Sequence, residues 1–180
     1  MSDTTTAPAA ADAATQAALE RLNTVIDRLI APDGCPWDST QTPESLTEYV
    51  IEECHELVDA IRSGKTADMV EELGDVAFLI LMIGKLMARA GGPSLADALE
   101  VEAAKMVRRH PHVFSDTTYE NQSEQLKDWD RIKREEKAAA DAEGPKGTYD
   151  SLPRGLPPLT KAYRIHSKAD RVGFTWPENE

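Results

Sequence analysis

Hydrophobic residues recur every three or four positions along most of the chain, a spacing typical of amphipathic helices. This pattern predicts helices over residues 15–29, 42–63, 66–90, 94–110 and 121–140, and a shorter helical segment over residues 159–169. The alternation of apolar and polar positions that marks β-strands occurs nowhere. We therefore expect an all-α fold, a helical bundle.

The residues that flank these segments support the predicted helix ends. Thr42 is a predicted N-cap, with Pro43 at the first helical position, and Gly64 ends the same helix. Residues 1–15 are small and polar, without periodicity, so we expect a disordered N-terminal tail. Residues 16–140 then form the main domain, and residues 141–180 form a linker and a C-terminal helical segment.

The composition excludes several classes of protein. A formal net charge of −12 argues against a nucleic-acid or membrane-surface binder, because both need a basic surface. Two cysteines make no disulfide framework, and we see no secretory signal. The most apolar run, residues 76–87, is too short to span a bilayer, which takes about 20 residues. We expect a cytoplasmic protein.

The predicted second helix places carboxylates on the face that it should bury. Successive helical residues are about 100° apart, so Glu53 and Glu56 point with the apolar stripe, Glu52 lies at its edge and His55 lies nearly opposite. The stripe itself consists of Leu46, Tyr49, Val50, Leu57 and Ala60.

The predicted third helix repeats this arrangement. Glu72 and Asp75 share one side with Leu79, Ile83 and Leu86. Its other side is also apolar, which suggests a core shared with a second subunit. That side consists of Leu73, Val76, Ala77 and Ile80.

Four inward carboxylates repel one another unless they are protonated, paired with Lys or Arg, or bound to cations. Oxygen ligands at this density suit Mg²⁺ or Mn²⁺. The ordinary alternative is that such acids form a solvated helix face. A di-iron site is not supported, because the Glu-x-x-His of Glu52 and His55 has no second copy. His110 and His112 could bind metal, although a turn after a helix explains them equally well.

Basic and aromatic residues follow in the later helices. Lys105 and Arg109 are four apart and share a face, which suits a phosphate clamp, although cations are also favoured at a helix C-terminus. Trp129 and Lys133 share a face of the predicted fifth helix. Trp37, in a Pro-Trp-Asp loop, either anchors that loop or contacts a ligand.

Five sequence blocks in this order resemble the MazG family of nucleoside triphosphate pyrophosphohydrolases, over residues 31–137. The blocks are GCPWDSTQTPESL, EECHE, EELGD, KMVRRHPHVF and DWDRIKREEK. The resemblance implies a helical bundle of the all-α NTP pyrophosphatase type, with its core completed by dimerisation, and a MazG-like catalytic domain over residues 16–140. It also implies cleavage of NTPs and dNTPs between the α- and β-phosphates, with broad base specificity, to give monophosphates and pyrophosphate.

The resemblance also implies roles for individual residues. Glu53, Glu56, Glu72 and Asp75 would bind two or more Mg²⁺ ions, for which Mn²⁺ could substitute. Glu52 would orient or deprotonate the attacking water, so Glu52 and Glu53 are the catalytic candidates. Lys105 and Arg109 would bind phosphates, and Trp129 and Lys133 would line the nucleotide site. Residues 151–176 resemble the segment that leads into a second catalytic domain in two-repeat members.

Two alternatives to this function stay open. One is a base-specific relative, similar to dUTPases and dCTPases or to phosphoribosyl-ATP pyrophosphohydrolase. The other is a non-catalytic, metal-binding helical module for protein interactions. The expected partners are nucleoside triphosphates and a second copy of the chain, with no nucleic acid and no membrane.

Overall fold

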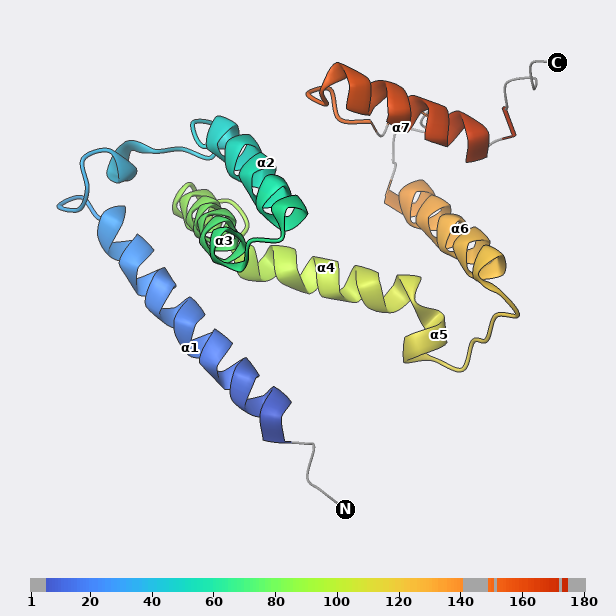
Figure 1. Cartoon of the computed structure of the whole chain (residues 1–180), viewed down its shortest axis with the longest axis horizontal. Coiled ribbons are helices and arrows are strands. Elements are labelled where there is room, and N and C mark those ends of the chain that lie inside the picture. Colours follow the sequence, from blue (N-terminus) through green and yellow to red (C-terminus); the bar gives the residue numbers. More distant parts are fainter. Residues whose placement is uncertain (1–5, 141–148, 151, 172, 175–180) are drawn as a thin grey trace. The chain divides into compact units, whose positions relative to one another are not determined.

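The structure, a computed structural model, describes residues 6–140, 149–150, 152–171 and 173–174 (Figure 1). In order, its helices are α1 (Thr6–Leu29), the 3₁₀ turn η1 (Asp38–Thr40), α2 (Thr47–Ser63), α3 (Thr66–Arg89), α4 (Leu95–Arg109), α5 (Pro111–Phe114), α6 (Gln122–Ala140) and α7 (Pro158–Arg171). The described residues contain no strand, which confirms the all-α prediction. None of the described helices combines the length and apolarity needed to cross a membrane.

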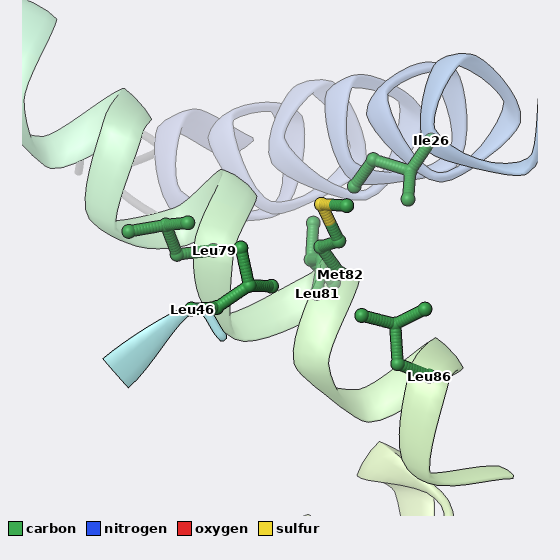
Figure 2. Close-up of a cluster of buried hydrophobic side chains, with 6 residues drawn as sticks. All are labelled: Ile26, Leu46, Leu79, Leu81, Met82 and Leu86. Atoms are coloured by element: carbon green, nitrogen blue, oxygen red, sulfur yellow. The ribbon is translucent and has the colours of Figure 1, made fainter. Parts of the chain in front are cut away.

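The chain divides into two compact units, residues 1–104 and residues 105–180, and each is described by itself. In the first unit, α3 packs against α2 and α1. Its core is shown in Figure 2. The core side chains are Ile26, Leu46, Leu79, Leu81, Met82 and Leu86. Met82 is fully buried at the middle of α3, where the apolar pattern is densest.

Polar contacts in the first unit join α3 to α1 and end α2. Lys85 on α3 donates a hydrogen bond to Asp27 on α1, with 2.6 Å between Nζ and Oδ1. Gly64 ends α2 as predicted: its φ of 70° is left-handed, and its N–H bonds to the Ala60 and Ile61 carbonyls.

Helix α2 begins later than predicted, at Thr47 rather than after Thr42. Ser45 N donates to Thr42 Oγ1 and Thr42 N donates to Ser45 Oγ, so Thr42 makes the hydrogen bonds of a helix cap, as predicted. Residues 43–46 nevertheless form a turn, in which Thr47 N donates to the Glu44 carbonyl, and the α-helix starts beyond it.

The helices predicted over residues 66–90, 94–110 and 121–140 agree with the structure to within one residue at each end. Helix α4 is capped by Ser94, whose N–H donates to Asp97, while Asp97 N donates to the Ser94 hydroxyl. Helix α1 extends back to Thr6, so the predicted start at Thr15 was too late, and the predicted disordered tail was wrong over residues 6–14. Residues 1–5 lie outside the described residues, as does most of the predicted linker over residues 141–148. The predicted main domain, residues 16–140, stays a prediction.

Candidate metal site and basic cluster

Three carboxylates from two neighbouring helices meet in the first unit. Oxygen atoms of Glu53 and Glu56 on α2 and of Glu72 on α3 all lie within 4.8 Å of one another. Glu53 and Glu72 are half-buried, whereas Glu56 is exposed. The helical spacing of Glu53 and Glu56 puts both acids on one side of α2, and the packing of α2 on α3 adds Glu72.

The charges of these groups oppose one another. Burial raises the pKa of the Glu53 carboxyl, and the carboxylates of Asp75, Glu56 and Glu52 raise it further. Burial also raises the pKa of Glu72, and Glu56 is the strongest of the charges that add to this shift. Among the described residues, no Lys or Arg forms an ion pair with the three glutamates. The cluster therefore holds more negative charge than its own surroundings neutralise.

The donor set fits a hard divalent cation. Two oxygens on one Mg²⁺ ion lie at most about 4.2 Å apart, since each Mg–O distance is about 2.1 Å. The oxygens of the three carboxylates lie within 4.8 Å of one another, so small side-chain movements would bring them to this separation. Carboxylate oxygens are the ligands that Mg²⁺ and Mn²⁺ prefer over softer metals.

Asp75 and Glu52 lie at the margin of this cluster. Both are exposed, and neither is among the three residues whose oxygens lie within 4.8 Å of one another. Both carboxylates nevertheless act electrostatically on Glu53. The predicted metal-binding role of Asp75 and the predicted catalytic role of Glu52 stay predictions.

The second unit brings together the predicted phosphate- and nucleotide-binding residues. The Arg109 guanidinium carbon lies 5.8 Å from the centroid of the Trp129 ring, and Lys133 Nζ lies 4.1 Å from the same centroid. Two cations therefore lie over one aromatic ring. Lys105, one turn before Arg109 on α4, is half-buried.

Glu136 is a member of this basic cluster that the sequence analysis missed. Its Oε2 accepts hydrogen bonds from Arg109 Nε at 2.8 Å and Nη2 at 2.6 Å, and its Oε1 accepts one from Arg108 Nε at 3.1 Å. The Arg109 guanidinium, followed by that of Arg108, lowers the pKa of Glu136. No spacing rule pairs an acid on α6 with arginines 27 and 28 positions earlier.

A second polar network joins α6 to the segment before it. Tyr119 donates to Asp128 at 2.7 Å, and Arg131 Nε donates to the other oxygen of Asp128 at 2.8 Å. The Tyr119 ring also lies 5.5 Å from the ring of His112, whose Nε2 lies 3.0 Å from Gln125 Nε2. The His110 ring lies 5.8 Å from that of His112, and its Nδ1 lies 2.7 Å from the Met106 carbonyl oxygen. Both histidines therefore pack around α5, and no metal cluster among the described residues includes them.

Comparison with known proteins relates the first unit's site to a known domain. The sequence model of the MazG nucleotide pyrophosphohydrolase domain matches residues 41–114, a range that contains Glu52, Glu53, Glu56, Glu72 and Asp75. This part of the chain is similar to the MazG domain.

Two individual relatives show how far the similarity extends. The chain is 38% identical to a nucleoside triphosphate pyrophosphohydrolase of Escherichia coli strain K12, over 88% of this chain and 59% of the relative. It is 41% identical to the uncharacterized protein YabN of Bacillus subtilis, over 78% of this chain and 28% of the relative. The chain thus spans well under two thirds of the length of either relative.

A solved structure extends the likeness to three dimensions. The crystal structure of a MazG-related protein from Thermotoga maritima matches with a TM-score of 0.55 and 29% sequence identity. The match covers 64% of this chain and 98% of that protein. This agreement supports the predicted all-α fold of the MazG type.

Proposed function

We propose that this MazG-like domain is a divalent-cation-dependent nucleoside triphosphate pyrophosphohydrolase. The observation that carries the proposal is the convergence of Glu53, Glu56 and Glu72 within the region that the family matches. The names of relatives such as the E. coli nucleoside triphosphate pyrophosphohydrolase support the same reaction class.

The chain's own residues supply the positions that this chemistry needs. Mg²⁺ or Mn²⁺ would be held by Glu53, Glu56 and Glu72, with Asp75 at the margin. We propose two or more ions, which would also bind the substrate's phosphates. Such ions neutralise charge on the phosphates and favour attack by water on phosphorus. Glu52, which is exposed next to Glu53, would accept a proton from that water. We propose attack at the α-phosphorus, with pyrophosphate as the leaving group.

The basic cluster would bind the phosphates or the nucleotide. In the structure, Glu136 accepts from Nε and Nη2 of Arg109, so the Nη1 group and the second N–H of Nη2 point away from this pair. The predicted roles of Trp129 and Lys133 at the nucleotide site stay predictions.

We also propose that the active form is a homodimer and that it acts in the cytoplasm. Helix α3 exposes large apolar side chains, with Val70 69%, Leu73 60% and Ile80 48% exposed. A row of this kind is typical of a surface that a second protein covers. Replacement of Leu73 by Asp should lower the mass measured by sedimentation, and an unchanged mass would contradict the proposed interface.

A product analysis tests the reaction. The chain is incubated with Mg²⁺ and each of the common NTPs and dNTPs, and the products are separated by anion exchange. We expect monophosphate and pyrophosphate from several bases, and no product after addition of a chelator. Turnover of nucleotides that carry one base alone would favour a base-specific enzyme. Diphosphate with orthophosphate, or no turnover, would contradict the proposal.

A further inference from the structure

Two exposed aromatic rings contact each other near the start of α2. Trp37, in the loop before η1, is 49% exposed, and Tyr49 on α2 is 40% exposed. Their centroids are 5.6 Å apart and their planes are nearly perpendicular, at 88°. An edge-to-face pair covers one of its four ring faces, and the exposed fractions show that part of each aromatic residue is open to solvent.

The loop that carries Trp37 is held firmly by hydrogen bonds. The Trp37 carbonyl accepts bonds from Thr40 Oγ1 at 2.9 Å and from Gln41 Nε2 at 3.0 Å. Arg89 at the end of α3 donates to the carbonyls of Ile30, at 3.0 Å, and Gln41, at 3.4 Å. The indole is therefore presented on a preorganised loop, which lowers the entropic cost of binding a ligand.

The turn before Trp37 is equally constrained. The Cβ that any other residue would add at Gly34 would lie 2.3 Å from the Arg28 carbonyl oxygen. Only glycine permits this close approach of the loop to the end of α1.

Tyr49 connects the aromatic pair to the three carboxylates. Tyr49, Glu53 and Glu56 are spaced by four and three residues, so they form one stripe along α2. The helix rises about 1.5 Å per residue, which separates Tyr49 from Glu53 by about 6 Å along the axis and from Glu56 by about 10 Å. A nucleotide has a similar layout, in which a flat base is separated from its phosphates by one sugar.

We propose that Trp37 and Tyr49 bind the base of the nucleotide whose phosphates are directed to Glu53, Glu56 and Glu72. This inference rests on the proposed function and assigns the base to a specific surface. Trp129 is the less suitable aromatic, because Arg109 and Lys133 lie over its ring. Stacking accepts any base, since every base has a π face, so the assignment also explains broad specificity.

The first test separates the contribution of the base from that of the phosphates. Replacement of Trp37 by Ala should raise KM for NTPs about 10-fold or more, because aromatic stacking contributes about 1–3 kcal/mol per base. The inhibition constant of inorganic tripolyphosphate, which has phosphates but no base, should stay unchanged. Trp37→Phe should recover much of the lost affinity. An unchanged KM in Trp37→Ala would overturn the inference.

The second test is a binding measurement that needs no turnover. AMP and CMP are titrated in chelator, and the quenching of tryptophan fluorescence is recorded for the full chain and for the Trp37→Phe and Trp129→Phe variants. We expect quenching to be lost in Trp37→Phe and kept in Trp129→Phe. The reverse result would place the base at Trp129 and overturn the inference.

The outcomes also separate this inference from the proposed function. Quenching at Trp37 without NTP turnover would support the aromatic site and contradict the reaction. Turnover without any effect of Trp37 would support the reaction and contradict the aromatic site. If Trp37→Ala raised KM and the tripolyphosphate inhibition constant together, with a loss of mass in sedimentation, the pair would be a contact between copies of the chain.

Discussion

The two charged clusters differ in whether their charges are paired. The acidic cluster lies on α2 and α3, and the basic cluster lies on α4 and α6. At the basic cluster, Glu136 pairs with both Arg108 and Arg109, at distances of 2.6–3.1 Å. At the acidic cluster, the three glutamates face one another, and the pKa values of Glu53 and Glu72 are raised. The first cluster is stable by itself, whereas the second gains stability only when protons or cations arrive from solution.

This contrast has a functional meaning. Charged groups that are already paired contribute to folding, and the donors that they use in these pairs bind a ligand only by exchanging partners. Carboxylates that repel one another lower the stability of the fold, but they also bind cations more readily. Binding sites often combine these two properties. Changes to the two clusters should therefore have effects of different kind and, for stability, of opposite sign.

The largest expected effect follows from the loss of one cluster carboxylate. Glu53→Gln keeps the shape of the side chain and removes a cation ligand, so turnover should fall about 100-fold or more. Steady-state kinetics at several Mg²⁺ concentrations measure this change. Glu48→Gln, on the opposite side of α2, is the matched control and should keep near-normal turnover. Full activity of Glu53→Gln at saturating Mg²⁺ would remove its proposed role.

Cation binding should also stabilise the fold. At a Mg²⁺ concentration about 100 times the dissociation constant, the free energy of unfolding should rise by about 2.7 kcal/mol. Thermal denaturation with Mg²⁺ and with chelator measures the difference. The Glu53→Gln variant should show a much smaller rise, and an equal rise in both proteins would place the bound ion elsewhere.

A smaller loss of stability is expected at the basic cluster. Glu136→Gln removes the carboxylate that pairs with Arg108 and Arg109 and should lower the free energy of unfolding by about 1 kcal/mol, because the groups are partly exposed. Urea denaturation measures this change. A gain in stability would show that the two clusters do not differ as described.

The smallest effects concern pH, and here the two clusters should differ in sign. The pKa of Glu136 is lowered in the folded state, so its contribution is present above the unfolded value of about 4.3 and is lost as the pH falls through the folded pKa. The difference in stability between the unmodified chain and Glu136→Gln should therefore shrink in strong acid.

The pKa of Glu72 is raised, so its protonated form favours folding, and this benefit is lost as the pH rises through the folded pKa. In chelator at neutral pH, Glu72→Gln should be more stable than the unmodified chain, and this difference should shrink on acidification. Melting curves between pH 7 and pH 3 compare both variants. If Glu72→Gln and Glu136→Gln both lowered the free energy of unfolding at neutral pH, repulsion in the acidic cluster would not destabilise the fold as described.

Much of this architecture could be predicted from helical periodicity. Helical spacing placed Glu53 and Glu56 on one side of α2, and the packing of α3 on α2 brought Glu72 to them, although Glu56 is exposed rather than inward. Gly64 marked a helix end because a left-handed residue was needed there. These features depend on residues that are close in sequence or on one helix face.

The features that were missed are a local change of backbone geometry and a contact between side chains that are far apart in sequence. Residues 43–46 form a turn before α2, although Thr42 and Ser45 make the paired hydrogen bonds of a helix cap. The pairing of Glu136 with Arg109 joins two helices, and its residues are 27 positions apart. Periodicity describes the face of a helix, but it does not identify the partner that a charged side chain selects.

The most direct test of the account is a calorimetric titration of Mn²⁺ into the metal-free chain and into a variant with Gln at positions 53, 56 and 72. The account predicts saturable binding to the unmodified chain and loss of that binding in the triple variant, while circular dichroism shows the same helix content. Equal Mn²⁺ affinity in the two proteins would contradict the central claim that Glu53, Glu56 and Glu72 form the cation site.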